Sequence, residues 1–145
     1  MIVLVIHFFV NRSPHLALIL LFNLMGVRLM NRFLKNIYDR TRPDHTPLLD
    51  AGGFSFPSGH SMNSAAFFGF LGYLLWVYFS RSGVKKNYIL YISGFLVLLI
   101  GLSRVYLGVH FPSDVIAGFA AGGVWLLLSM LLLKISAPQR QRKTR

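Results

Sequence analysis

His110 and Asp114, four residues apart, form the pair in this sequence best suited to nucleophilic chemistry. A neutral imidazole attacks phosphorus efficiently when a carboxylate on its other nitrogen fixes the tautomer and stabilises the imidazolium that forms. Phosphoryl transfer also needs cations over the equatorial oxygens, and Arg104 lies six residues before His110. A histidine with a nearby aspartate is more often only a structural hydrogen bond. The stretch therefore indicates phosphoryl transfer only if other stretches support it.

A second stretch, residues 35–43, brings two cations into one short segment. Lys35 and Arg42 are seven residues apart, almost two helical turns, so both would point the same way if a helix ran through them. Pro43 disfavours a helical conformation at Arg42 and ends such a helix. We therefore expect both cations to reach one anion. The alternative is a basic cluster that holds lipid headgroups, and residues 35–43 taken alone favour that alternative.

A third stretch, Pro-Ser-Gly-His at 57–60, leads directly into an apolar segment. The first N–H groups of a helix are free to bind an anion, and the helix dipole favours negative charge there. Gly59 allows the backbone to approach closely, and His60 is placed to act on a bound phosphate. The alternative is an ordinary helix cap at Ser58 or Ser61, with His60 merely at the membrane interface.

The elements that must position these residues are apolar. Hydrophobic residues make up 54% of the 145, and four segments approach the roughly 20 residues that a bilayer requires: 16–34, 61–79, 88–107 and 115–133. Residues 1–10 are too short to cross and are interpreted as the end of a helix whose beginning is absent. We expect an all-α, polytopic transmembrane helix bundle in one domain, 1–145, with a helical core at 16–133 and a basic tail at 134–145. The absence of cysteine excludes disulfides and thiolate chemistry.

The distribution of charge predicts the topology. Four spans place the 35–60 loop and the 103–114 turn on one face of the membrane, together with all four acidic residues. The other face carries nine of the fifteen basic residues and no acid: Arg12, Arg81, Lys85, Lys86, Lys134, Arg140, Arg142, Lys143 and Arg145. By the positive-inside rule that face, with the C-terminal tail, is cytoplasmic, and the histidine face lies outside the plasma membrane. Membrane topology thus accounts for the net charge of +11, and nucleic acid is a poor candidate partner.

Two arginines lie inside the first span. Arg28 and Arg32 share a helical face with Lys35. A charge within a span is functional unless its long side chain reaches the headgroups. For Arg28 a functional role and a contact with the headgroups both stay open, whereas for Arg32 a contact with the headgroups is the favoured interpretation.

Together the three stretches supply three cations, a backbone anion site, two histidines and a carboxylate. They read Lys-x6-Arg-Pro at 35–43, Pro-Ser-Gly-His at 57–60 and Ser-Arg-x5-His-x3-Asp at 103–114. This three-part signature resembles, at every position, that of the type 2 phosphatidic acid phosphatase and haloperoxidase superfamily, over about residues 16–133.

The resemblance implies a role for each residue. His110 would be the nucleophile that forms a phosphohistidine, Asp114 would orient it, and His60 would be the general acid for the leaving group. The residues implied to hold the phosphoryl oxygens are Lys35, Arg42, Arg104, Ser58 and Gly59. No metal or cofactor is implied, since the arginines and lysine supply the charge and four dispersed aspartates without glutamate make a poor two-metal site. The family fold has six helices, so this chain would lack the first and most of the second.

The implied function is a membrane lipid phosphatase whose partners are the bilayer and a lipid phosphate. Candidate substrates are phosphatidylglycerophosphate, phosphatidate and undecaprenyl diphosphate, and the likeness of residues 55–61 and 103–114 to bacterial phosphatidylglycerophosphatases favours a glycerolipid. One alternative is a non-catalytic or degenerate fragment of the same family. Another is a vanadium haloperoxidase, against which four spans argue because those relatives are soluble.

Overall fold

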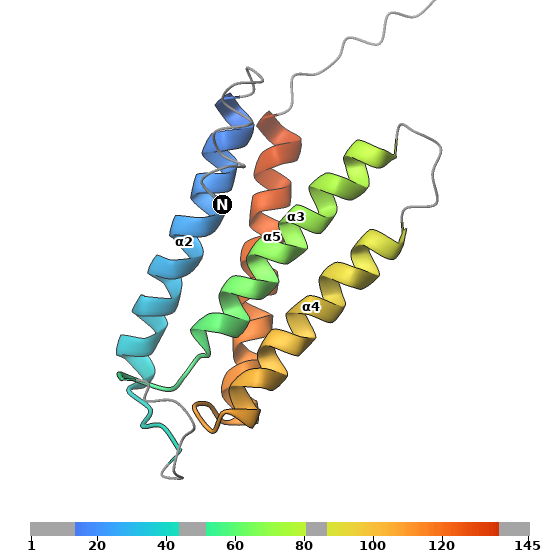
Figure 1. Cartoon of the computed structure of the whole chain (residues 1–145). Coiled ribbons are helices and arrows are strands. Elements are labelled where there is room, and N and C mark those ends of the chain that lie inside the picture. The colour runs from blue at the N-terminus through green and yellow to red at the C-terminus, as the bar shows by residue number, and fades with distance from the viewer. Residues whose placement is uncertain (1–13, 44–51, 81–86, 137–145) are drawn as a thin grey trace, which may run out of the picture.

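The computed structural model describes residues 14–43, 52–80 and 87–136, and its regular structure there is entirely helical. The helices are α2 (Pro14–Tyr38), α3 (Gly59–Phe79), α4 (Asn87–Tyr106) and α5 (Pro112–Ser136) (Figure 1). All four are long and apolar enough to cross a membrane. The expectation of an all-α bundle with four candidate spans is confirmed. The expected partial helix at 1–10 lies outside the described residues, as does the tail after Ser136.

Two helices extend further than the hydropathy predicts. α2 continues through Lys35 to Tyr38, and α5 continues through Lys134 to Ser136. Hydropathy marks only the part of a helix that suits hydrocarbon, whereas the backbone hydrogen bonds continue into the polar interface. The predicted 35–60 loop therefore begins four residues later than expected, at residue 39, and the predicted tail begins within a helix.

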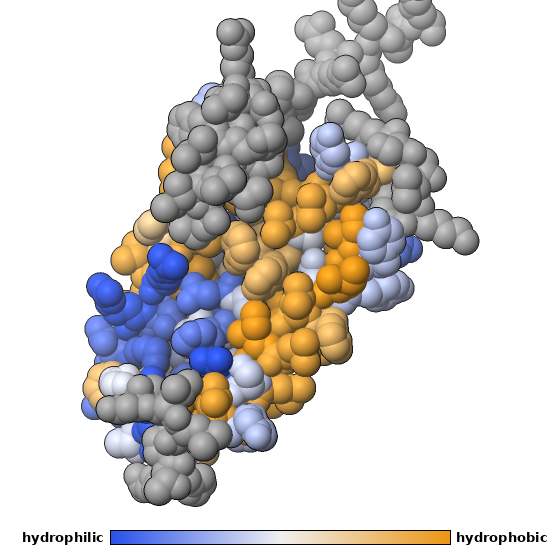
Figure 2. All heavy atoms as spheres, viewed as in Figure 1, coloured by the Kyte–Doolittle hydropathy of each residue, from blue (hydrophilic) through white to orange (hydrophobic). Residues whose placement is uncertain are grey.

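The helices form a bundle with α3 at its centre. α3 packs against α2, α4 and α5, and α2 also contacts α5. Figure 1 shows that α2 and α4 finish, and α3 and α5 begin, at one end of the bundle, which we call the polar end. Figure 2 shows apolar residues over α3 and α4 and hydrophilic residues gathered towards the polar end. The described parts of the segments expected on one membrane face lie at one end of the molecule (Figure 1).

The contact between α3 and α5 depends on two glycines one turn apart. A Cβ atom on Gly118 would lie 2.7 Å from the Ser58 carbonyl oxygen, and one on Gly122 would lie 2.4 Å from that of Met62. Small residues at this spacing let two membrane helices approach at backbone distance. The glycines therefore bring the start of α5 directly against the start of α3.

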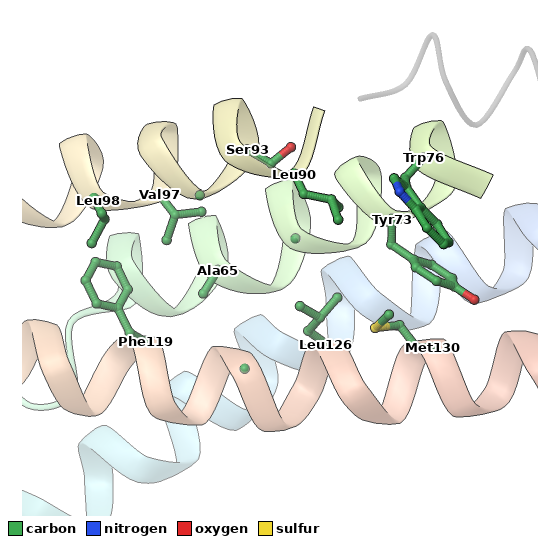
Figure 3. A pocket seen from close by; sticks show the side chains of 13 residues that line it. Ala65, Tyr73, Trp76, Leu90, Ser93, Val97, Leu98, Phe119, Leu126 and Met130 are labelled. Atoms are coloured by element: carbon green, nitrogen blue, oxygen red, sulfur yellow. The ribbon is translucent and has the colours of Figure 1, made fainter. Parts of the chain in front are cut away.

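An apolar pocket of about 630 Å³ lies between α3, α4 and α5 (Figure 3). Its wall includes Ala65, Val97, Phe119 and Leu126, and the described residues that line it carry no charge at neutral pH. Such a surface suits hydrocarbon, and its described lining has no His, Asp, Glu, Lys or Arg. The chemistry must therefore be sought at the polar end.

Candidate active site

The three predicted stretches meet at the polar end through hydrogen bonds to backbone carbonyl oxygens. Ser58 N donates to the carbonyl oxygen of Asp114 at 2.9 Å, and Arg42 Nη1 donates to that of Val109 at 2.7 Å. Ser55 N donates to the carbonyl oxygen of Arg40 at 2.7 Å. Segments that are far apart in the sequence are thus joined around one small volume.

A sharp turn after α4 places His110 at the centre of this volume. Gly108 has a φ of 70°, a left-handed conformation that glycine adopts without a steric penalty, and its N–H donates to the Val105 carbonyl oxygen at 3.0 Å. Pro112 then begins α5 with a φ already suited to a helix. His110 is held in the short segment between the two helices and is buried.

His110 is in the protonation state that a nucleophile needs. Burial lowers its pKa to about 4, helped by the charges of Arg42 and Lys35 and opposed by Asp114. The imidazole is therefore neutral at pH 7. Its Nδ1 atom lies 3.5 Å from Asp114 Oδ2 and has no hydrogen-bond partner in the described part of the chain. The predicted pair is present, with a separation slightly longer than an ordinary hydrogen bond.

Asp114 has more partners than the sequence predicted. Its Oδ1 atom accepts from Arg40 Nη1 at 2.9 Å, and its Oδ2 atom accepts from the Phe111 N–H at 2.9 Å and from the Ser55 hydroxyl. The contact with Phe111 is one half of a capping box, because Asp114 is the third residue of α5 and its side chain accepts from the N–H of the residue before the helix. The carboxylate is fully buried, so these donors are what make its charge tolerable there.

Arg40 and Ser55 are functional candidates that the sequence reasoning missed. Spacing alone assigns Arg40 no role, yet its guanidinium also donates to the Ser113 hydroxyl at 2.9 Å and lies 4.3 Å from the centre of the Phe111 ring. The available signal was proximity: Arg40 is two residues before Arg42, and Ser55 is three before Ser58.

Lys35 and Arg42 bind the backbone of residues 52–54. Arg42 donates to the carbonyl oxygens of Gly53 at 3.0 Å and Gly52 at 3.1 Å, besides that of Val109, and Lys35 donates to the carbonyl oxygen of Phe54. Burial lowers the pKa of Arg42 below its ordinary value while Asp114 acts in the opposite direction, and the guanidinium stays charged at neutral pH. Both cations are close enough to act electrostatically on both histidines.

The start of α3 leaves backbone donors near these cations. Ser58 is the N-cap, its buried hydroxyl accepting from the Ser61 N–H at 3.5 Å and from the Ser61 hydroxyl at 3.0 Å. This is the capping role that the sequence left open. The N–H groups of Gly59 and His60, the first two residues of the helix, have no acceptor within it. They are available to an anion.

His60 and Arg104 complete the set. The His60 side chain is exposed on the first turn of α3, and the charge of Arg104 is near enough to act on it. Arg104 itself donates only to the neighbouring Ser103 hydroxyl, at 3.2 Å, among the residues that the structure describes. Within residues 14–43, 52–80 and 87–136, no three side chains of the His, Cys, Asp and Glu types lie together as a metal site. The site thus concentrates cations, two histidines and one carboxylate.

The histidines outside the signature do not join this cluster. His15 is in the first turn of α2, at the opposite end of the bundle (Figure 1). His7 and His45 lie outside the described residues.

Known proteins share both the sequence and the fold. Phosphatidylglycerophosphatase B of Bacillus subtilis is 45% identical over 105 residues, which are 72% of this chain and 50% of that protein. A lipid A 1-phosphatase of Rhizobium etli is 38% identical over 114 residues, which are 72% of this chain and 44% of that protein. The chain therefore spans about half the length of these curated relatives.

Two solved structures are similar to this one. The transmembrane PAP2-type phosphatidylglycerolphosphate phosphatase of Bacillus subtilis has a TM-score of 0.78 at 38% identity, over 86% of this chain and 62% of that chain. Aquifex aeolicus LpxE has a TM-score of 0.65 at 28% identity, over 88% of this chain and 74% of that chain. The sequence model of the PAP2 superfamily matches residues 16–136, which include all three motifs. The chain therefore belongs to the PAP2 superfamily, as a multi-pass membrane protein.

Proposed function

We propose that this protein hydrolyses the terminal phosphate of a membrane lipid through a phosphohistidine intermediate, without a metal. The observation that carries the proposal is His110 itself. A buried imidazole with a pKa near 4 is neutral at pH 7, lies beside a carboxylate, and faces two cations that would attract a phosphate. A structural histidine needs no such surroundings.

The reaction would proceed in two displacements at phosphorus. Nε2 of His110 attacks, a nitrogen–phosphorus bond forms, and the bond from phosphorus to the lipid oxygen breaks. Asp114 stabilises the positive charge that develops on the imidazole, and His60 gives a proton to the departing oxygen. Water then attacks the phosphorus, the nitrogen–phosphorus bond breaks, and a proton of that water passes to His60. Inorganic phosphate leaves, and both histidines return to their starting states.

The phosphoryl oxygens would be held by donors that the observed hydrogen bonds leave free. Arg42 uses three of its five N–H donors on carbonyl oxygens, and Lys35 uses one of three. The remaining donors, with Arg104 and the backbone N–H groups of Gly59 and His60, supply the positive surroundings that phosphoryl transfer needs. The Ser58 hydroxyl acts indirectly, because as the N-cap it orients those backbone groups.

We propose phosphatidylglycerophosphate as the preferred substrate, with phosphatidate and undecaprenyl diphosphate as the other candidates. The similarity to a phosphatidylglycerophosphatase at 45% identity supports this order. The distribution of basic residues supports an active site outside the plasma membrane and a cytoplasmic C-terminal tail.

The test is phosphate release by the purified protein in detergent from each of the three lipids. We expect release that His110→Ala and His60→Ala abolish and that the matched variant His15→Ala preserves, because His15 lies at the other end of α2. No release from any of the lipids would favour the non-catalytic alternative. Oxidation of halide with added vanadate would instead favour a haloperoxidase.

A further inference from the structure

Arg28 is an exposed cation within the α2 span that the proposed mechanism does not use. It lies three residues before Asn31, whose Nδ2 donates to the Pro57 carbonyl oxygen at 3.2 Å and whose Oδ1 would lie 2.8 Å from a Cβ on Gly59. At ~1.5 Å of rise per residue, Arg28 is therefore about 4.5 Å further into the bundle than the start of α3. A charge within a span is stable only where it meets an opposite charge or water. No hydrogen bond or ion pair joins it to another described residue.

Arg28 lines a groove that begins at His60. The groove has a volume of about 500 Å³ and lies between α2, α3 and α4. His60, Asn63 and Arg28 form its polar part, whereas Phe67 and Ile100 are among the apolar residues of its wall. Phe67 is seven residues after His60 on α3, so the apolar part continues about 10 Å into the span. The groove thus has a cationic mouth at the catalytic acid and an apolar interior.

This arrangement matches the leaving group of an anionic lipid. In the proposed mechanism His60 protonates the oxygen that departs from phosphorus, so whatever is bonded to that oxygen continues from His60 into the groove. The apolar wall suits an acyl or prenyl chain. Arg28, beside His60, suits a second negative charge close to the scissile bond.

We propose that Arg28 binds a second phosphate group within the leaving part of the substrate and thereby makes the enzyme selective for lipids with two phosphates over phosphatidate. This inference rests on the proposed function. The leaving part of phosphatidate is an uncharged diacylglycerol, which gives Arg28 nothing to bind. The leaving part of phosphatidylglycerophosphate carries a phosphodiester, and that of undecaprenyl diphosphate carries a phosphate.

The first test compares kcat/KM on the three lipids in wild type, Arg28→Gln, Arg28→Lys and the matched variant Arg32→Gln. Arg32 has the same charge, lies one turn along α2 and does not line the groove. We expect Arg28→Gln to lower kcat/KM about tenfold or more on a two-phosphate lipid and less than about twofold on phosphatidate, since a charged hydrogen bond is at stake. Arg28→Lys should restore part of the loss, and Arg32→Gln should change neither value. Comparison of the two diphosphorylated lipids shows whether a phosphodiester or a phosphate is preferred. An equal loss on all three lipids, or no loss, overturns the inference.

The second test measures binding without turnover, so that it decides the role of Arg28 even if no lipid is hydrolysed. The chain has no cysteine, so Phe67→Cys introduces a single thiol in the groove wall. In the His110→Ala background, phosphatidylglycerophosphate should protect this thiol from a membrane-permeant maleimide at a lower concentration than phosphatidate does. Adding Arg28→Gln should raise the protecting concentration of phosphatidylglycerophosphate about tenfold and leave that of phosphatidate unchanged. Equal protection by the two lipids would overturn the inference, whereas the proposed function fails only if wild type releases no phosphate.

Discussion

Replacing Asp114 with asparagine removes a negative charge beside His110 while keeping the size of the side chain. At 3.5 Å and an effective dielectric constant of ~20, a full charge on each group would give an attraction of about 5 kcal/mol. Arg40 Nη1, 2.9 Å from Oδ1, already offsets part of the carboxylate charge. We therefore expect asparagine to raise the barrier for phosphohistidine formation by about 3 kcal/mol, a roughly hundredfold fall in kcat.

Phosphate binding should respond differently to the same change. The carboxylate repels a bound phosphate, whereas Lys35 and Arg42 supply the attraction. Removing the carboxylate charge should therefore leave the inhibition constant of inorganic phosphate unchanged or slightly lower. Kinetics on phosphatidylglycerophosphate, with phosphate as a competitive inhibitor, separate the two effects.

The variant also has a structural effect that must be measured. In either orientation the asparagine NH₂ meets a donor, Arg40 Nη1 or the Phe111 N–H, so one donor is left without an acceptor. This should destabilise the fold by about 1–3 kcal/mol and lower Tm. Asp39→Asn is the matched control, because Asp39 is exposed at the same end and its φ of 47° suits asparagine. An unchanged kcat in Asp114→Asn would refute the role of Asp114 in orienting His110. A fall in kcat no larger than the fraction of unfolded protein would refute it as well.

Three further predictions concern the same end of the bundle. Arg40→Gln should lower kcat about tenfold with little change in KM, because Asp114 loses its ion pair but keeps its other donors. Arg40→Lys should recover part of the lost kcat. An unchanged kcat in Arg40→Gln would show that Asp114 does not need the ion pair with Arg40. Gly122→Ala should lower Tm in thermal unfolding, because the new Cβ would lie 2.4 Å from a carbonyl oxygen of α3. The control Gly123→Ala should leave Tm unchanged, because its Cβ would have no neighbouring atom within 4 Å among the described residues, beyond the backbone of its own helix and its two chain neighbours. His110 takes up a proton near pH 6.5 in the unfolded chain but only near pH 4 in the folded protein. Because the unfolded chain binds more protons between these values, the free energy of unfolding should be highest above pH 6.5 and should fall as the pH drops towards 4. His110→Gln should reduce that loss in Tm measured across this range, and an identical pH profile in the two proteins would contradict the lowered pKa.

The helices could be predicted from the sequence because each span is an almost unbroken run of apolar residues. Hydropathy alone located α2 to α5, and only their ends differed: α2 continues to Tyr38 and α5 to Ser136, because hydropathy marks only the apolar part of a helix. The convergence of the three motifs was also predictable. Four spans with short connections place residues 35–60 and 103–114 on one face, and the described residues at the polar end do meet there.

The environment of Asp114 was not predictable by the same means. Arg40 reaches it only because α2 ends at Tyr38 and Asp39 takes a left-handed φ of 47°, which redirects the chain. Ser55 reaches it because the returning segment pairs with Arg40 through a 2.7 Å backbone hydrogen bond. Neither contact follows from periodicity or spacing, since both depend on the path of a loop after a single turn.

The distance between the two halves of the site is set by helix packing, to which the catalytic motifs contribute little. Gly118 lies one turn after Asp114 on α5, and its missing side chain lets α5 approach the Ser58 carbonyl oxygen. The same approach allows Ser58 N to donate to the Asp114 carbonyl oxygen at 2.9 Å. A larger residue at position 118 would push the start of α3, with Gly59 and His60, away from the start of α5, which follows His110. The spacing of nucleophile and acid therefore depends on a glycine that touches neither.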